Sequence, residues 1–304
     1  MKIFLNKISE DWIIDRVSSE FKKNFKTLIT RNIKKADVVW IIAPWTWRKI
    51  SEKSLIGKKV LCSYYHFDFS KFDLDEFNYL DQFVDEYHVI SKKTKEDLIK
   101  LTEKKITSIP FWVDEDLFFN IKEKDSLRER YEFKKNEYLV GSFQRDTEGS
   151  DLSSPKLIKG PDIFLNIVRE IFEENSNLKV VLSGKRRQYL INNFEKLGIP
   201  YKHFEMVDIK TLNELYNLLD IYIVSSRIEG GPQAIIECGL TKTPIISTNV
   251  GVASEILSPA SIYKDSNFKD ARPDINVAYQ NSLNFTKENG LNKFFKMIEL
   301  LYEN

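Results

Sequence analysis

The chain has 304 residues, of which 42% are apolar and 30% charged, a composition typical of a globular protein with room for two domains. Its sequence has no apolar run of about 18 residues and no leader pattern at its start, so we expect neither a membrane-spanning helix nor secretion, and predict a cytoplasmic protein. The net charge of +1 argues against general nucleic-acid binding.

Short β-branched or aromatic runs alternate with helical patterns along the chain. In the first half, strands are predicted at residues 2–5, 37–43, 59–65, 86–90 and 105–109. Helical patterns between them cover residues 10–25 and 92–101. Such alternation is typical of parallel sheets that are covered by helices on both faces.

The first 60 residues are basic, with 14 Lys and Arg against 6 Asp and Glu. Within them, a helical pattern over residues 21–35 mixes apolar side chains with several cations. These cations are Lys22, Lys23, Lys26, Arg31, Lys34 and Lys35. Two interpretations remain open: peripheral contact with anionic lipid at the inner membrane face, or a helix packed on its sheet with a solvated basic face.

Residues 114–136 are rich in charge and have no strand pattern, so we place the break between two domains there. The second half then begins afresh, with strands predicted at residues 138–143, 178–182, 221–225 and 244–247. Its helices are predicted at residues 161–174, 188–197, 209–219, 232–239 and 252–257. An amphipathic pattern over residues 289–304 predicts a final helix.

Cysteine and histidine are too sparse to indicate a metal site. Cys62 and Cys238 lie in apolar runs far apart in the sequence, which favours two buried thiols over a disulfide. The three histidines are scattered and form no cluster with ligand spacing, so no metal site is predicted.

The glycines point to a phosphate site in the second half. Only Gly57 precedes position 141, and neither a dinucleotide-binding nor a P-loop motif occurs. The best candidate is the segment 225–233, SSRIEGGPQ, which follows a predicted strand and opens a helix. Pro232 suits a first helical position, and the amides of Gln233 and Ala234 would point outward, which favours an anion. An ordinary strand-to-helix turn is the alternative.

Two carboxylates bracket this turn. Glu229 precedes the helix, and Glu237 lies inside it among apolar residues. A carboxylate on so apolar a helix requires hydrogen-bond donors, which either a ribose or a structural partner would supply. The cations are expected from another loop, where Arg145 follows a strand and Lys159 precedes a helix, and Lys156 competes for the lysine role. Alternatively, these are solvated cations on a long loop.

These motifs, in this order, resemble the retaining nucleotide-sugar glycosyltransferases of the GT-B fold, specifically glycosyltransferase family 4, also called glycosyl transferases group 1. Residues 229–237, EGGPQAIIE, match the two glutamates that the family spaces by seven residues. Further matches are Arg145, residues 159–160, the flanking segments 215–216, 220–226, 239, 244–248 and 250–256, and the linker segments 89–91, 109–114 and 118. The likeness covers residues 89–257.

The resemblance implies a role for each matching residue. Arg145 and Lys159 would hold the donor diphosphate, Glu237 the ribose, and Val207 would touch the base. Glu229 would contact the transferred sugar. The backbone at Gly230, Gly231, Pro232, Gln233 and Ala234 would bind phosphate and sugar oxygens. His66 looks like the family's histidine near the reacting sugar, although a histidine after a strand is also a common structural residue.

The expected fold is α/β and GT-B, with two Rossmann-like domains whose parallel sheets face each other across a cleft. Residues 1–120 would form the acceptor-side domain, 134–285 the nucleotide-sugar domain, and 286–304 a helix that crosses back to the first.

The expected function is retaining transfer of a hexose-type sugar from a UDP- or GDP-sugar to a glycan or lipid acceptor, without metal or other cofactor. The family's glycine pair after the first strand is missing, since residues 6–10 read NKISE. This departure keeps open a non-catalytic GT-B partner subunit that binds a nucleotide or carbohydrate.

Overall fold

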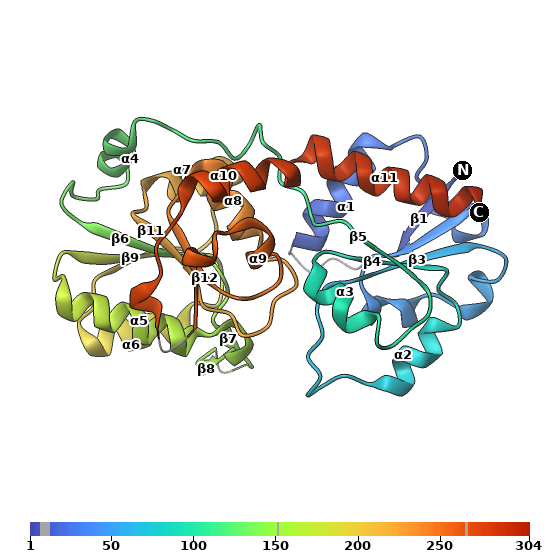
Figure 1. Ribbon diagram of the computed structural model, residues 1–304, viewed down its shortest axis with the longest axis horizontal. Helices are drawn as coiled ribbons and strands as arrows, with labels where there is room; N and C mark the ends of the chain where they lie inside the picture. Colours follow the sequence, from blue (N-terminus) through green and yellow to red (C-terminus); the bar gives the residue numbers. More distant parts are fainter. Residues whose placement is uncertain (7–12, 151, 265–266) are drawn as a thin grey trace. The chain divides into compact units, whose positions relative to one another are not determined.

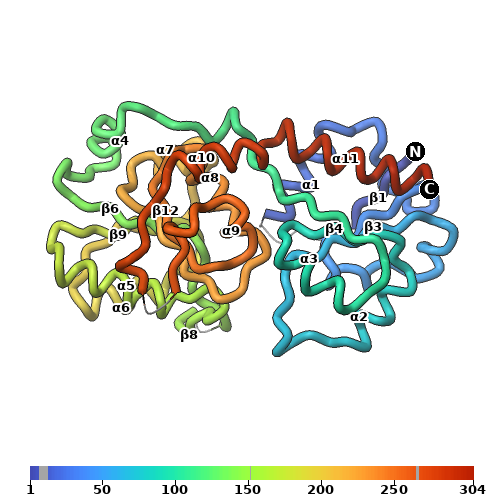
Figure 2. Tube along the Cα trace, in the orientation of Figure 1, coloured from blue at the N-terminus to red at the C-terminus, as the bar shows by residue number. Residues whose placement is uncertain are grey.

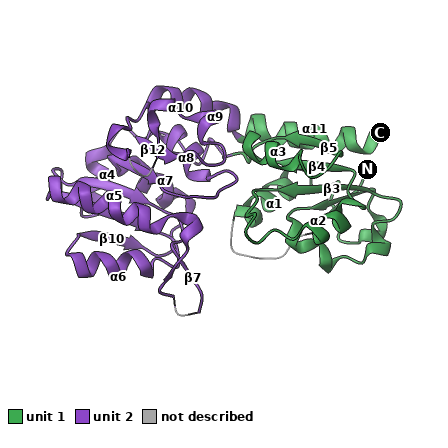
Figure 3. Ribbon diagram, turned by 60° about the horizontal axis from the view of Figure 1, so that its bottom comes forward, with its two compact units in different colours: residues 1–112, 287–304 green, residues 113–286 purple. Residues whose placement is uncertain are grey.

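The chain forms two compact units, shown in different colours in Figure 3. The structure is a computed structural model, and it describes residues 1–6, 13–150, 152–264 and 267–304. Unit 1 comprises Met1–Trp112 and Lys287–Asn304, and unit 2 comprises Val113–Thr286. The sequence places the first boundary at residue 120, whereas the charged linker after Trp112 belongs to unit 2. The chain passes between the units twice, after Trp112 and after Thr286. The two segments lie side by side at these points, where the Val113 amide donates to the Phe285 carbonyl at 2.9 Å.

Unit 1 is built on a parallel sheet whose described strands follow the order β1-β2-β3-β4-β5 (Figure 1). The strands are β1 (Ile3–Asn6), β2 (Val38–Ile41), β3 (Lys59–Tyr64), β4 (Glu86–Val89) and β5 (Lys105–Ser108), and each overlaps a predicted strand. Ile29 forms an isolated parallel bridge with Ile3. The chain therefore runs along one edge of β1 before it returns to the other side of that strand as β2.

Helices cover both faces of the unit 1 sheet. They are α1 (Ile13–Asn24), α2 (Leu74–Asp81), α3 (Lys92–Leu98) and α11 (Lys287–Glu303). Alternate residues of a strand point to opposite faces. Accordingly, Trp40 of β2 packs with α1 and α11, whereas its neighbour Ile41 packs with α2 and α3. The ring of Phe294 on α11 lies 4.6 Å from that of Trp40, which anchors the returning C-terminal segment in unit 1.

The prediction of one helix over residues 21–35 is wrong. Helix α1 ends at Asn24, a turn and the isolated bridge at Ile29 follow, and Ile33–Lys35 forms a short 3₁₀ helix. Phe21 is fully buried, and Phe25 stacks on Phe295 with ring centroids 4.1 Å apart. The apolar side chains of the segment are therefore used in the core of unit 1. Among the described residues, no helix is both long and apolar enough to cross a membrane.

Unit 2 holds a second parallel sheet, in which the described strands follow the order β10-β9-β6-β11-β12-β13. The strands are β6 (Tyr138–Ser142), β9 (Leu178–Ser183), β10 (Tyr201–Phe204), β11 (Ile221–Val224), β12 (Ile245–Thr248) and β13 (Ile262–Tyr263). This is the Rossmann order, in which two halves diverge from the central pair β6 and β11. The sequence does not predict β10 and β13, because one is a half-buried edge strand with polar residues and the other has two residues.

The helices of unit 2 match the predicted ones closely at α5 (Pro161–Glu174), α6 (Gln188–Leu197) and α7 (Ile209–Leu218). The others are α4 (Lys124–Arg130), α8 (Gln233–Thr241), α9 (Ala253–Ile256) and α10 (Ile275–Ser282). A small hairpin pairs β7 (Thr147–Glu148) with β8 (Ser154–Pro155). Figure 2 traces the chain through these elements. Cys238 on α8 and Cys62 on β3 are buried and free, as predicted.

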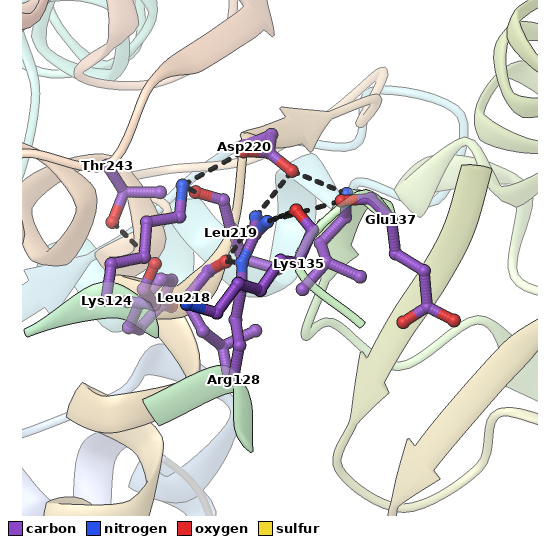
Figure 4. A network of polar contacts seen from close by, with 10 residues as sticks. Lys124, Arg128, Lys135, Glu137, Leu218, Leu219, Asp220 and Thr243 are labelled. Atoms are coloured by element: carbon purple, nitrogen blue, oxygen red, sulfur yellow. Dashed lines mark hydrogen bonds and ion pairs between the residues drawn. The ribbon is translucent and has the colours of Figure 1, made fainter. Parts of the chain in front are cut away.

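The charged linker contains a helix, α4, that the sequence does not predict. Its buried Arg128 donates to the Leu218 carbonyl at 3.0 Å and to the Asp220 carboxylate at 2.6 Å (Figure 4). Lys124 donates to the same carboxylate at 3.0 Å, and the Leu139 amide donates to it at 2.8 Å. Asp220 thus joins the linker to β6 and β11, and the charges in this segment hold unit 2 together.

Candidate functional site

Apart from Val207, the predicted site residues of unit 2 lie on the loops and the helix that follow β6 and β11. In a sheet of this order, the crevice at the point where strand order reverses is the usual ligand position. β6 leads into the loop that carries Arg145 and Lys159, and β11 leads into the loop that carries Glu229. The fold therefore brings to one edge of one sheet two loops that are more than fifty residues apart in the sequence.

Side chains and backbone connect the two loops directly. The Gln144 amide nitrogen donates to the Lys159 carbonyl at 2.9 Å, and the Ser225 hydroxyl donates to the same carbonyl at 3.3 Å. The Ser226 hydroxyl donates to Gln144 Oε1 at 3.1 Å. Both serines are fully buried, whereas Gln144 and Lys159 are partly exposed. These bonds hold the backbone of Lys159 against the end of β11.

Two glycines allow close backbone approach. Gly160 has φ +60°, and a Cβ at this position would lie 1.8 Å from the Ser225 carbonyl oxygen. Gly251 has φ +50°, and a Cβ there would lie 2.3 Å from the Gly230 carbonyl oxygen. Both positions need the left-handed conformation and the missing side chain of glycine. Sequence comparison with the family points to both residues, but only the structure gives the reason.

Lys159 and Glu229 form an ion pair in the structure. The Lys159 ammonium donates to Glu229 Oε1, and the Ser226 hydroxyl oxygen lies 3.2 Å from the same oxygen. Both charged side chains are mostly buried, with 15% and 12% of their surface exposed. Lys159, which is predicted to bind the diphosphate, therefore contacts Glu229, which is predicted to bind the transferred sugar. A bound donor would have to share or replace this contact.

The loop of Lys159 carries two further cations, Arg145 and Lys156. Burial lowers the pKa of Lys156, and the nearby charges of Arg145 and Lys159 lower it further. Burial also lowers the pKa of Arg145, with Arg186 as the next cause. The negative charge of Glu148 opposes this effect and raises the pKa of both Arg145 and Lys156. Like charges held this close repel one another, so an anion placed among them would be stabilised.

Helix α8 differs slightly from the prediction. It begins at Gln233, and Pro232 is the N-cap residue rather than the first helical residue. The first turn of a helix leaves its amides without intrahelical acceptors, which favours an anion near Gly231, Gln233 and Ala234. Gly230 and Pro232 are buried, whereas Gly231, Gln233 and Ala234 are partly exposed.

Glu237 is 4% exposed and lies on α8. The Tyr216 hydroxyl donates to its Oε2 at 2.7 Å, so a tyrosine holds this carboxylate oxygen. Burial raises the pKa of Tyr216 well above its ordinary value, and the neighbouring Glu237 charge adds to the effect. The phenol therefore stays protonated and remains a donor to the glutamate.

The other predicted residues lie elsewhere in the structure. Val207 is half-buried between β10 and α7 and packs against the core of unit 2. His66 is half-buried in unit 1, just after β3. The glycine-free loop after β1 falls on residues 7–10, which are outside the described part of the chain.

Sequence reasoning missed a buried ion pair behind the loop of Arg145. Arg187 is fully buried, Asp146 is 2% exposed, and Arg187 Nε lies 3.2 Å from Asp146 Oδ2. Burial raises the pKa of Asp146 to about 6, against the opposing effect of Arg187. The Lys156 amide donates to the Asp146 carbonyl at 2.8 Å. This pair supports the cation-bearing loop from inside, and nothing in the sequence pairs two residues 41 positions apart.

Comparisons with known proteins give a family match over part of the chain and a shared fold. Residues 154–288 match the family model described as "Glycosyl transferases group 1". A search of curated protein sequences gave no significant match.

Solved structures share the fold, which is GT-B. One is Anabaena Alr3699/HepE, solved in complex with UDP and glucose, with a TM-score of 0.74, 12% identity and coverage of 98% of this chain and 99% of that one. Sucrose-phosphate synthase from Thermosynechococcus elongatus gives a TM-score of 0.71 and 13% identity, covering 98% and 81%. Pneumococcal O-GlcNAc transferase GtfA, in complex with UDP and GlcNAc, gives 0.66 and 15%, covering 96% and 60%.

Proposed function

We propose that the chain is a retaining glycosyltransferase that moves a hexose-type sugar from a UDP- or GDP-sugar to a glycan or lipid acceptor. The main support is the loop after β6 that carries Arg145, Lys156 and Lys159, because it contacts the loop before α8 through the ion pair of Lys159 with Glu229. The family match over residues 154–288 includes Lys159 and the segment 229–237. Similar folds solved with UDP add support for the donor class.

In this proposal Arg145 and Lys159 bind the diphosphate, and Lys156 joins them. When the bond between the anomeric carbon and the phosphate oxygen breaks, the electron pair leaves with the diphosphate. The cations and the amides of α8 stabilise that developing negative charge. Because side chains supply the positive charge, the transfer needs no metal ion.

The two glutamates have separate roles. Glu237 binds the ribose, and its position against Tyr216 holds one oxygen in place. Glu229 contacts the transferred sugar from the mouth of α8, and the donor takes over part of its contact with Lys159. The acceptor hydroxyl bonds to the anomeric carbon on the face that the diphosphate leaves, and its proton passes to the departing phosphate.

The decisive test starts from donor binding. UDP-, GDP- and ADP-sugars are screened by thermal shift, and each donor that binds is then assayed for hydrolysis, with EDTA present in a parallel sample. We expect one nucleotide class to stabilise the protein and its sugar to be released at a measurable rate. Binding without any turnover would favour the alternative, a non-catalytic GT-B partner subunit.

We also propose a weaker, purely electrostatic contact of unit 1 with anionic membranes. Its basis is the group of exposed cations Lys23, Lys26, Arg31, Lys34 and Lys35. Because the apolar side chains of this segment pack inward, no insertion into lipid is expected. Sedimentation with anionic and with neutral vesicles tests the proposal, and equal, negligible pelleting with both would reject it.

A further inference from the structure

Unit 1 contains a pocket of about 350 Å³ at the carboxyl ends of β2 and β3. Its walls are the 3₁₀ helix Pro44–Lys49, the loop after β3 and one side of α2. Among the described residues, seven aromatic side chains line it, and Leu80 is the one aliphatic side chain besides Pro44. The volume lies at the lower end of the roughly 300–1,000 Å³ range of small-molecule sites.

Two aromatic rings are exposed here, one in the lining of the pocket and one beside it. Trp45 lines the pocket and is 49% exposed, and its ring centroid lies 6.0 Å from that of Tyr65. Phe69 is 57% exposed and stacks on the pocket residue Phe67 at 5.4 Å, with an angle of 12° between the planes. Exposed aromatic surface next to a pocket indicates a binding site, because water hydrates it poorly.

A hydrogen-bonded pair of charged side chains forms another part of the wall. Arg48 donates to Glu76 through Nε at 2.9 Å and through Nη2 at 2.6 Å, and the Trp47 indole donates to the same carboxylate at 2.6 Å. The guanidinium carbon lies 4.1 Å from the ring centroid of Trp47. Asp68 and Lys71 add further polar groups to the lining.

The lining distinguishes between possible occupants. An alkyl chain would desolvate Arg48, Glu76, Asp68 and Lys71 without offering them hydrogen bonds, which is unfavourable. A hexose ring has apolar C–H faces that can stack on aromatic rings, and hydroxyl groups that can bond to carboxylates and guanidinium groups. We propose that this pocket binds a hexose ring of a glycan acceptor.

The identification as an acceptor site rests on the proposed function. His66, which the family resemblance places near the reacting sugar, lines the same pocket. A sugar bound there would present a hydroxyl group close to that imidazole. The exposed rings and the charged wall thus select the acceptor class, a carbohydrate rather than a lipid chain.

Saturation-transfer NMR on the full chain, without nucleotide, tests the site. The probes are the methyl glycosides of glucose, galactose, mannose and N-acetylglucosamine, with octyl alcohol as the apolar probe. Trp45→Ala and Phe69→Ala remove the exposed rings, and Tyr302→Ala on α11, 44% exposed in the same unit, is the matched control. We expect at least one glycoside to bind the wild type and the control alike, and both pocket variants to bind it about tenfold more weakly or worse.

Three results would overturn the inference. In the first, both pocket variants bind the glycoside as tightly as the wild type does. In the second, none of the four glycosides gives a saturation-transfer signal with the wild type. In the third, octyl alcohol is the one probe that binds. Calorimetry with UDP on the same samples separates this inference from the proposed function. If the wild type does not bind UDP, the donor proposal fails, while glycoside binding in unit 1 is still measured. We expect all four proteins to bind UDP equally.

Discussion

Replacing Gly160 by alanine tests whether contact between the two loops creates the donor site. The residue has φ +60°, and the new Cβ would lie 1.8 Å from the Ser225 carbonyl oxygen, where real contacts of this kind exceed 3.0 Å. The left-handed conformation costs about 1 kcal/mol for alanine, and the overlap adds roughly 1–3 kcal/mol of strain or displacement. The loop must move by about 1 Å, and a shift of that size can lower function by up to about 100-fold.

Gly198→Ala is the matched control. Gly198 has φ +65° at the end of α6, and a Cβ there would meet nothing within 4 Å. It therefore carries the conformational cost of about 1 kcal/mol without the overlap. Urea unfolding and calorimetry with UDP are run on both variants. We expect Gly160→Ala to lose about 2–4 kcal/mol of stability and at least tenfold in UDP affinity, and Gly198→Ala to bind UDP normally. Equal UDP affinity in the two folded variants would refute the reasoning.

Three further predictions follow from the site and from the core of unit 1. Arg145→Ala should weaken UDP binding about tenfold or more, since a charge-assisted hydrogen bond contributes roughly 1.5–3 kcal/mol; an unchanged dissociation constant in calorimetry would remove Arg145 from the site. Glu237→Gln should weaken binding of UDP, whereas Glu229→Gln should lower kcat and kcat/KM together and leave UDP affinity nearly unchanged. If both glutamine variants weaken UDP binding equally in calorimetry, the division of roles is wrong. Burial lowers the pKa of His88 from 6.5 to about 4, so its neutral form stabilises the fold above pH 6.5, and up to about 3 kcal/mol is lost as the pH falls to 4. Urea unfolding between pH 4 and 7 should show a weaker acid dependence for His88→Asn; an identical slope would contradict this origin.

Local patterns in the sequence determined much of this protein. The parallel strands, the repeated strand–helix units and the position of residues 229–237 between β11 and α8 follow from runs of apolar residues, glycines and prolines that act over a few positions. The loop carrying Arg145 and Lys159 could be predicted as a source of cations for the same reason. The resemblance to a family then connected these local features.

Only the tertiary structure decided which of these residues meet. The ion pairs of Lys159 with Glu229 and of Asp146 with Arg187 join residues far apart in the sequence. The prediction over residues 21–35 failed because the backbone around Ile29 pairs with Ile3 of β1, and this tertiary pairing overrides the local helical pattern. Strand order and side-chain partners depend on how whole elements pack, and packing energy is shared among distant residues that a local pattern does not record.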